Sequence, residues 1–373
     1  MQFQVHAQDG SSAARSGSLS FPSGEVETPV FMPVGTRATV KGLTSLDLRS
    51  CGTTMLLANA YHLALRPGPE IVDEVGGLHR FMGWDGPILT DSGGYQVFSL
   101  SDLNDVSDDG VEFRSPIDGA LMHLGPREAM RIQELLGPDV AMVLDECPPY
   151  PCSREEARSA VERTLRWAEE CQSHHQRDGQ ALFGIVQGGV YDDLRELCAE
   201  RLRGQDFEGY AIGGVSVGEP DDERRRMTAF TAPLLPQDKL RYLMGVGFPE
   251  DLLHAVAQGV DMFDCVAPTR MGRNATAFTR NGRVRIRNSC FKRDVEPLEA
   301  TCDCTCCRLY SRAYLNHLFR SDEMLGPVLL TVHNLTFYHR LMSDARNAIK
   351  EGRFESFRQQ FVSDYSGRKE DPQ

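Results

Sequence analysis

The stretch Val140-Ala-Met-Val-Leu144, followed by Asp145-Glu-Cys147 and by a helical pattern that begins at Ser153, contains the unit from which the fold is built. The apolar run is short and uninterrupted, which is typical of a strand buried on both faces of a parallel sheet. Ser153 is a favourable N-cap, and acidic side chains follow it in the first turn of a helix that runs toward His175. The sequence here predicts a strand, a polar strand end and a helix.

The same alternation of apolar runs and amphipathic segments continues between Val26 and Cys265. Eight strands are expected, at residues 30–34, 54–58, 87–90, 140–144, 182–186, 210–212, 241–244 and 260–263. Further helices are expected to begin at Pro126, Asp192, Asp221 and Pro249. Eight strands with helical crossovers over about 240 residues have the size of an α/β protein of the (β/α)8 TIM-barrel class. A doubly wound open sheet is the alternative, because periodicity alone does not show that a sheet closes.

Six of the expected strands end in a polar or glycine-rich cluster. These clusters begin at Asp91, Asp145, Gln187, Gly213, Gly245 and Asp264. In a barrel the carboxyl ends of the strands converge on one mouth, where active sites are built, whereas in an open sheet they spread along an edge. The clusters therefore favour the barrel.

The composition is that of a globular protein, with 41% hydrophobic and 25% charged residues in a chain of 373. No apolar run is long enough to span a bilayer. The first residues, Met1-Gln-Phe-Gln-Val-His6, lack the charged and apolar regions of a secretory signal, so we expect a cytoplasmic protein. A net charge of −13 argues against non-specific nucleic-acid binding by the whole surface.

A local basic stretch nevertheless follows the last expected strand. Residues 265–293 contain eight basic side chains and no acidic one. Within this stretch, residues 277–287 read as a hairpin with a turn at Asn281-Gly282. Arg283, Arg285 and Arg287 alternate along the second strand of the hairpin, so all three are expected on one face.

Cysteines cluster after the hairpin. The chain has eleven, and four of them fall in Cys302-Asp-Cys304-Thr-Cys306-Cys307. Without a secretory signal, such a count does not indicate a disulfide framework. The spacing Cys-x-Cys-x-x-Cys offers three thiolates, and structural zinc takes four soft or borderline ligands in a tetrahedron. We therefore predict one structural zinc ion held by Cys302, Cys304, Cys307 and one histidine.

Four side chains are candidates for the fourth ligand: Cys306, His317, His333 and His339. Cys306 is adjacent to Cys307, and adjacent residues rarely both reach one tetrahedral centre. His317 is expected in the middle of a helix. His333 lies between an apolar run and Asn334, at an expected helix start, and we favour it.

Asp91, Asp145 and Asp264 each follow an expected strand directly. A single strand-end aspartate is as readily a helix N-cap as a catalytic group, but three at one mouth favour a site. Paired carboxylates suit displacement at an anomeric carbon, one attacking C1′ and the other moving a proton. The basic stretch after Asp264 suggests that the sugar belongs to a nucleic acid, whose phosphates need cations.

Other strand-end residues suit a purine base. Tyr95 can stack on a flat heterocycle. Asp145 can accept two hydrogen bonds from a guanine-like N–H and NH2 edge. Gln187 and the backbone N–H of Gly214 can donate to the carbonyl oxygen of the same ring, because glycine lets the backbone approach a ligand closely.

At this point the motifs resemble those of the tRNA-guanine transglycosylase family. The resemblance is carried by Asp91-Ser-Gly-Gly-Tyr-Gln96, Leu144-Asp-Glu-Cys147, Gly184-Ile-Val-Gln-Gly-Gly189, Ala211-Ile-Gly-Gly214, Met262-Phe-Asp-Cys-Val-Ala-Pro-Thr-Arg270 and the zinc ligands with His333. It covers nearly the whole chain. It implies a zinc-containing (β/α)8 enzyme that acts on the wobble guanine of certain tRNAs.

The resemblance also implies roles for individual residues. Asp264 is the expected nucleophile, which forms a covalent link to the ribose, and Asp91 the expected proton donor and acceptor. The base is expected to contact Asp91, Ser92, Gly93, Gly94, Tyr95, Asp145, Gln187, Gly214, Val215 and Met244, with Tyr95 and Met244 on its two faces. The RNA is expected to contact Gly245, Val246, Gly247, Phe248, Pro249, Glu250, Asp251, Thr269, Arg270, Met271, Gly272 and Arg273.

The size of the base is a further expectation from the resemblance. Bacterial members take 7-aminomethyl-7-deazaguanine, whereas the eukaryotic enzyme takes the bulkier queuine. Cys147 and Val217 follow the bacterial pattern, while Val215 stands where bacterial members often have leucine. Bacterial members form homodimers, and we expect one here.

Three domains are expected. Residues 1–265 form the barrel with an N-terminal extension, residues 266–345 the basic hairpin and zinc subdomain, and residues 346–373 a C-terminal helix and tail. The tail from Tyr365 onward is expected to be disordered.

Two rival functions were weighed. A zinc-dependent RNA-binding protein without catalysis would explain the hairpin and the cysteines but not the three aspartates. A barrel glycosidase would explain the aspartates but not the basic stretch. The exchange enzyme accounts for both features.

Overall fold

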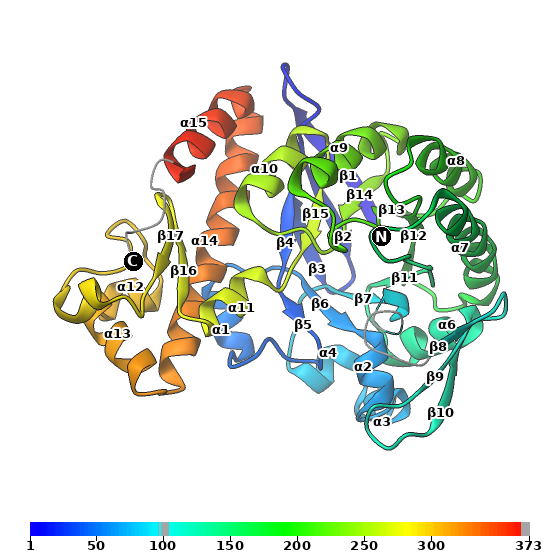
Figure 1. The fold of residues 1–373 in the computed structure, drawn as a ribbon, viewed down its shortest axis with the longest axis horizontal. Helices are drawn as coiled ribbons and strands as arrows, with labels where there is room; N and C mark the ends of the chain where they lie inside the picture. Colours follow the sequence, from blue (N-terminus) through cyan, green and yellow to red (C-terminus); the bar gives the residue numbers. More distant parts are fainter. Residues whose placement is uncertain (96, 98–103, 367–373) are drawn as a thin grey trace.

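Parallel strands form a closed barrel at the centre of the molecule (Figure 1). The computed structural model describes residues 1–95, 97 and 104–366. In the sheet order β4-β15-β14-β13-β12-β11-β7-β6-β5, the first and last members are consecutive pieces of one strand, β4 (Val30–Met32) and β5 (Val34–Gly35). Because β4 pairs with β15 and β5 pairs with β6, the ring closes. The barrel prediction is confirmed, and the open sheet is excluded.

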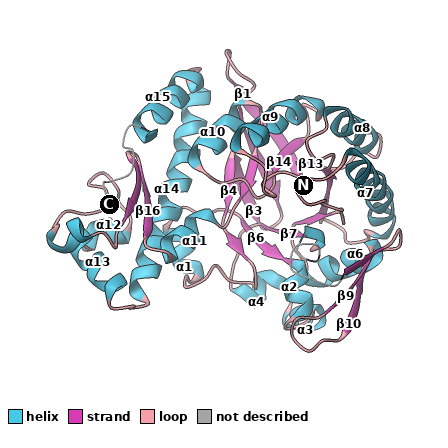
Figure 2. Cartoon of the chain, viewed as in Figure 1, coloured by secondary structure: helices cyan, strands magenta, loops and turns pink. Residues whose placement is uncertain are grey.

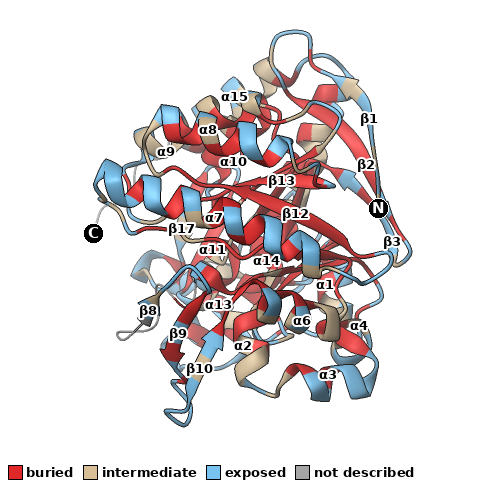
Figure 3. Ribbon diagram, turned by 90° about the vertical axis from the view of Figure 1, so that its right-hand side faces the viewer, coloured by how far each residue is buried: buried red, intermediate tan, exposed pale blue. Residues whose placement is uncertain are grey.

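The remaining barrel strands lie within two residues of the expected positions. They are β6 (Leu56–Asn59), β7 (Ile88–Asp91), β11 (Val140–Met142), β12 (Ala181–Val186), β13 (Gly209–Ile212), β14 (Leu240–Leu243) and β15 (Met262–Asp264). Nearly every residue in these strands is buried, as the uninterrupted apolar runs predict. Figure 3 shows the buried strands inside helices whose outer faces are exposed.

Helices surround the barrel (Figure 2). The five expected ones are α6 (Pro126–Leu136), α7 (Arg154–His174), α8 (Asp192–Arg203), α9 (Asp221–Thr231) and α10 (Pro249–Ala257), each starting where the sequence predicts. Ser153 caps α7: its hydroxyl accepts from the Glu156 N–H, and the Glu156 carboxylate accepts from the Ser153 N–H. Shorter helices precede these, at α1 (Ser45–Ser50), α2 (Ala60–Leu65), α3 (Pro69–Val75) and α4 (Gly77–Met82).

An antiparallel sheet of β1 (Gln2–Gln8), β2 (Arg15–Phe21) and β3 (Gly24–Thr28) packs at the end of the barrel where the strands begin, which we call the floor. The Arg15 guanidinium reaches into this end and binds the Asp261 carboxylate at 2.6 Å. A second small sheet, β8 (Asn104–Val106), β9 (Val111–Arg114) and β10 (Leu121–Leu124), is inserted after β7. The carboxyl ends of the barrel strands form the opposite end, the mouth.

The segment after β15 leaves the barrel and returns to it. It contains α11 (Ala267–Arg273), β16 (Thr276–Thr279), β17 (Gly282–Arg285), the 3-10 turns of η2 (Ser289–Arg293), α12 (Thr305–Leu309) and α13 (Arg312–Arg320). The long helix α14 (Leu325–Lys350) then runs back along the barrel and packs on β4. A Cβ at Gly272 would lie 2.9 Å from the Thr331 nitrogen, so α11 and α14 cross at a distance that glycine permits.

One expectation about the hairpin in this segment needs correction. The hairpin forms, but Thr279 pairs with Gly282, so its turn residues are Arg280 and Asn281 rather than Asn281 and Gly282. Gly282 follows the turn with a φ of 103°, a conformation that glycine adopts without strain. Arg283, Arg285 and Arg287 are all exposed, as their alternation predicts.

The C-terminal helix α15 (Phe354–Ser366) is present and extends further than expected. Tyr365 lies inside it and is buried, stacking on Phe361 with ring centroids 5.4 Å apart, so disorder from Tyr365 onward was wrong for the last two residues of this helix. The rest of the expected tail, residues 367–373, lies outside the described residues. The expected domain boundary at 345/346 falls inside the continuous helix α14.

Candidate active site and metal centre

Asp264 ends β15 at the mouth of the barrel. Its Oδ1 accepts hydrogen bonds from the Tyr242 hydroxyl at 2.6 Å and from the Gly245 N–H at 2.8 Å. Burial raises the pKa of Asp264, and these two donors act against that shift. The carboxylate is therefore held by two neutral donors, and among the described residues it forms no ion pair that would neutralise its charge.

Asp91 ends β7 and lies beside β6. Its carboxylate accepts from the Asn59 side chain at 2.6 Å and from the Ala60 N–H at 3.2 Å. Asp91 and Asp264 thus end two strands of the same barrel, and both lie at its mouth.

The third aspartate, Asp145, follows β11 and is almost completely buried. The Gln187 amide donates to its Oδ2 at 2.6 Å. Burial raises the pKa of Asp145 to about 6, and the Gln187 hydrogen bond opposes this rise. A Cβ at Gly94 would lie 2.5 Å from the Asp145 carbonyl oxygen, so the glycines after Asp91 bring its loop against Asp145.

Cys147 and Gly214 adjoin the same pair. The Cys147 thiol interacts with the Gln187 side chain and with the backbone of Gly214, and burial raises the pKa of this thiol to about 12. The Gln187 Oε1 is also buried. A Cβ on Gly214 would lie 2.4 Å from that oxygen, so only glycine fits. At the mouth, the Asp145 carboxylate, the Gln187 amide and the backbone turn at Gly214 therefore form one buried cluster.

Tyr95 and Met244, expected on the two faces of the base, are both at the mouth. The Tyr95 ring is 45% exposed, and partial burial raises the pKa of its hydroxyl, with a smaller contribution from the negative charge of Glu219. Met244 follows β14 and is half-buried. Ser92 is buried, and Gly93 packs against Tyr61.

A small cavity of about 150 Å³ extends from this site between the loops after β11, β12 and β13. Gly214, Val215 and Val217 line it, together with Tyr191 and Glu219. The Glu219 carboxylate accepts from the Val217 N–H at 2.9 Å and also from the Ser216 N–H. These bonds fix the turn that contains Val215.

The residues expected to contact RNA differ in exposure. Gly245, Phe248 and Arg270 are exposed, and Glu250, Met271 and Arg273 are half-buried. The others are buried: Val246, Gly247, Pro249, Asp251, Thr269 and Gly272. Asp251 binds the Arg224 and Arg225 guanidinium groups at 2.7 Å each, so its side chain positions α10.

The predicted metal ligands form a buried cluster. The ligand atoms of Cys302, Cys304, Cys307 and His333 all lie within 4.8 Å of one another. The His333 Nδ1 lies 3.8, 3.8 and 3.3 Å from the three sulfurs. A tetrahedral zinc with Zn–S near 2.3 Å and Zn–N near 2.0 Å separates sulfur from nitrogen by roughly 3.5 Å. The donor set and its spacing therefore fit zinc.

His333 is the right ligand, but it lies well inside α14 rather than at a helix start. Its Nε2 contacts the Phe278 carbonyl oxygen at 2.8 Å, so Nε2 carries the proton and Nδ1 faces the sulfurs. The other three candidates for the fourth metal ligand lie outside this cluster. Cys306 is buried outside the cluster, His317 is exposed on α13, and His339 contacts the Thr53 hydroxyl at 2.9 Å.

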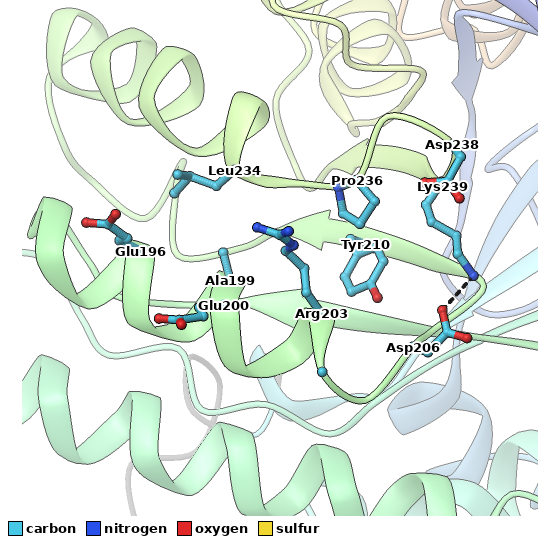
Figure 4. A pocket seen from close by; sticks show the side chains of 11 residues that line it. Glu196, Ala199, Glu200, Arg203, Asp206, Tyr210, Leu234, Pro236, Asp238 and Lys239 are labelled. Atoms are coloured by element: carbon cyan, nitrogen blue, oxygen red, sulfur yellow. Dashed lines mark ion pairs between the residues drawn. The ribbon is translucent and has the colours of Figure 1, made fainter.

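A larger hollow of about 680 Å³ lies at the floor of the barrel and not at the mouth (Figure 4). Lys239 and Asp206 form an ion pair of 2.9 Å at its edge, beside Tyr210 and Arg203. None of the polar strand ends lines it. Choosing the candidate site by cavity volume would therefore point to the floor of the barrel rather than to the mouth, where the polar strand ends lie.

Several residues of the site were missed by the sequence reasoning. Asn59 stands at a strand end, and the rule that selected Asp91 would have found it. Tyr242 and Arg195 lie inside regular elements, and nothing in their spacing distinguishes them from core residues. Their importance appears only from the groups they contact.

Comparison with known proteins gives a consistent result. Residues 9–367 match the family described as queuine tRNA-ribosyltransferase. The chain is 55% identical to the queuine tRNA-ribosyltransferase of Pelotomaculum thermopropionicum, covering 98% of this chain and 99% of the relative. It is 52% identical to the protein of that name from Desulforamulus reducens (97% and 98%) and 54% identical to that of Stenotrophomonas maltophilia (97% of each). The described part of the chain has no helix that is long and apolar enough to cross a membrane.

Proposed function

The chain belongs to the queuine tRNA-ribosyltransferase family and is therefore a tRNA-guanine transglycosylase of queuosine synthesis, and we propose that it replaces the wobble guanine of target tRNAs with 7-aminomethyl-7-deazaguanine by double displacement. The observation that carries the mechanism is that Asp264 and Asp91 both end barrel strands at the mouth, each with its carboxylate held by hydrogen-bond donors. A nucleophile and a proton carrier at one mouth are what displacement at C1′ requires.

Asp264 is the nucleophile of this mechanism. Both of its donors contact Oδ1, which leaves Oδ2 to attack C1′ of the ribose. The attack forms a C1′–O bond as the bond from C1′ to the guanine nitrogen breaks with its electron pair. Rigid placement by Tyr242 and Gly245 favours the attack because the carboxylate needs no reorganisation.

Asp91 moves the proton. It gives a proton to the departing guanine and takes one from the incoming base, whose nitrogen then displaces Asp264 from C1′. The Asn59 amide and the Ala60 N–H hold the carboxylate and support its ionised form between these steps. Two displacements at one carbon restore the original configuration.

Base recognition is assigned to the buried cluster around Asp145. Its carboxylate accepts from the N–H and NH2 edge, while Gln187 and the Gly214 N–H donate to the ring carbonyl. Tyr95 and Met244 cover the two faces. The cavity of about 150 Å³ beside Val215 and Val217 is assigned to the aminomethyl group of the base.

The tRNA is assigned to the surface beyond the mouth. Phe248, Arg270 and Arg273 offer exposed or half-exposed side chains, and the buried members of the same loops hold them in place. Residues 266–345 act in this proposal as one docking module next to the barrel of residues 1–265. We also propose that the protein acts in the cytoplasm as a homodimer.

Zinc is proposed for the Cys302, Cys304, Cys307 and His333 site. Bound there, the ion would cross-link the cysteine loop to α14 and supply no chemistry to the reaction, because the site is closed by four protein ligands. Its effect is to hold the hairpin, through His333 and Phe278, beside the RNA surface.

Guanine exchange tests the proposal. Labelled guanine is incubated with unmodified tRNA that carries a wobble guanine, and incorporation into the tRNA is measured. Incorporation is expected, followed by its loss when 7-aminomethyl-7-deazaguanine is added, and elemental analysis should give one zinc per chain. Folded, zinc-loaded protein that incorporates no label would contradict the proposed activity and would favour RNA binding without catalysis.

A further inference from the structure

Arg195, on α8, is completely buried close to the base site. Within the part of the chain that the structure describes, no carboxylate lies within 4.0 Å of its guanidinium. Its donors instead contact backbone carbonyl oxygens: Nε reaches Gly189 at 2.7 Å, and Nη2 reaches both Gly213 and Gly214 at 3.1 Å. A fourth contact, from Nη1 to the Thr231 hydroxyl, is 3.5 Å long.

A buried guanidinium without an ion-pair partner is costly, because its charge loses hydration. Burial lowers the pKa of Arg195 to about 10, so the group stays protonated at neutral pH. The chain also makes room for it. A Cβ on Gly188 would lie 2.7 Å from the backbone nitrogen of Arg195 and 2.8 Å from its Cγ. Glycine at position 188 therefore leaves the space that Arg195 occupies.

The carbonyls that Arg195 binds belong to the peptides that form the base site. The Gly213 C=O and the Gly214 N–H are the two ends of one peptide group. A charge-assisted hydrogen bond at the oxygen polarises that group and makes its N–H a stronger donor. The Gly214 C=O shares its peptide with the Val215 N–H in the same way. Gly214 has a φ of 61°, a left-handed backbone conformation that glycine adopts readily, and this conformation forms the turn.

We propose that Arg195 is a positioning residue of the exchange reaction: its guanidinium fixes the Gly213-Gly214-Val215 turn and strengthens the Gly214 N–H as a donor to the carbonyl oxygen of the base. The inference rests on the proposed contact between Gly214 and that oxygen. As the bond to C1′ breaks, guanine takes up negative charge that spreads to this oxygen. Arg195 transmits positive charge to it through one peptide group, without touching the base.

The test compares guanine with 6-thioguanine, both measured as competitive inhibitors of exchange. The two bases present the same N–H and NH2 edge to Asp145, but sulfur is a weaker acceptor than oxygen. The wild type is expected to bind guanine about tenfold more tightly. In Arg195→Met this ratio should fall to within about twofold, while the KM for tRNA stays unchanged.

Arg241→Met is the matched control. Arg241 is also buried, its Nη2 donates to the Leu235 carbonyl at 2.7 Å, and burial lowers its pKa to about 10 as well, but it lies at the floor of the barrel. Its replacement should lower thermal stability as Arg195→Met does and leave the ratio at the wild-type value. A ratio that falls equally in both variants would reduce Arg195 to a general structural role.

The remaining outcomes separate the two proposals. If the wild type binds both bases equally, the Gly214 contact is wrong and the inference falls with it. If the wild type discriminates and Arg195→Met keeps the full ratio, the inference about Arg195 is overturned while the Gly214 contact stands. Arg195→Lys, which keeps the charge but loses the planar fork, should give an intermediate ratio and decides the question if the methionine variant does not fold.

Discussion

Asp261 directly precedes strand β15 and Asp264 ends it, and their surroundings differ in kind. At the floor, the Asp261 carboxylate accepts from Arg15 Nε at 2.9 Å and Nη2 at 2.6 Å, and from the Arg241 N–H at 2.8 Å. At the mouth, the Asp264 carboxylate accepts from the Tyr242 hydroxyl and the Gly245 N–H, both of which are neutral donors. Burial raises the pKa of both carboxyl groups.

The difference shows that burial does not decide what an aspartate does. A guanidinium fork occupies both oxygens of Asp261 and neutralises its charge, which makes it a structural anchor for the N-terminal sheet. Neutral donors on one oxygen orient Asp264 and leave its charge and its second oxygen for chemistry. Variants at Asp264, Asp261 and Tyr242, and the pH dependence of base binding at Asp145, test this contrast.

Removing the mouth carboxylate should abolish exchange. For Asp264→Ala, and for Asp264→Asn with nearly the same shape, we expect the exchange rate to fall at least about 10³-fold, because neither side chain can attack C1′. The affinity for tRNA should stay within about twofold, since the carboxylate makes no phosphate contact. Labelled-guanine incorporation and a tRNA-binding titration measure the two quantities. Exchange near the wild-type rate would mean that Asp264 is not the nucleophile.

Neutralising the floor carboxylate should cost stability instead. In Asp261→Asn the buried Arg15 loses its counter-charge, and we expect the free energy of unfolding to fall by about 3–5 kcal/mol. Urea denaturation measures this loss. Exchange per folded molecule should remain close to wild type. A variant with normal stability and no exchange would reverse the roles assigned to the two aspartates.

Removing the Tyr242 hydroxyl should change the pKa of Asp264. Tyr242→Phe deletes a hydrogen bond to ionised Asp264, so the already raised pKa of Asp264 should rise by about another unit. Because the active form is the carboxylate, activity is lost as pH falls through this pKa, and the acidic limb of the pH–rate profile should move upward by that amount.

The control for this variant is Tyr210→Phe. Tyr210 is a buried tyrosine near the floor whose oxygen accepts from the Phe207 N–H at 3.2 Å. Its replacement removes a hydrogen bond of ordinary strength and should leave the pH profile in place. An unshifted acidic limb in Tyr242→Phe would show that the phenol does not tune the nucleophile.

The smallest expected effect concerns the third strand-end aspartate. Asp145 has a pKa of about 6, so it is ionised at neutral pH and becomes protonated as pH falls through that value. The protonated acid cannot accept both hydrogen bonds from guanine. The inhibition constant of guanine should therefore rise below pH 6, by up to about tenfold per pH unit. Asp145→Asn should bind guanine weakly with no such dependence, and a constant affinity from pH 7 to pH 5 would contradict the assignment.

Much of this molecule could be predicted from local sequence patterns. The eight strands are short apolar runs, which are typical of a buried parallel sheet, and the three cysteines are close enough in sequence that their spacing identifies them as candidate zinc ligands. His333 was chosen correctly on a wrong argument, because the expected helix start lies well inside α14. The hairpin turn was misplaced by one residue because Asn281-Gly282 fits two registers, and the pairing of Thr279 with Gly282 selects one of them.

The sequence alone predicted the apolar strands, the polar strand ends, the basic hairpin and the cysteine cluster, since each depends on residues within one element or one loop. Closure of the barrel and the position of His333 inside α14 depend on contacts between distant elements. The tertiary structure decided what surrounds each charge: Arg15 beside Asp261, Tyr242 beside Asp264, and Arg195 behind the Gly213-Gly214 turn. The physical reason is that Coulomb and hydrogen-bond energies act over a few ångströms in space. Residues 15 and 261 become neighbours only when the barrel closes.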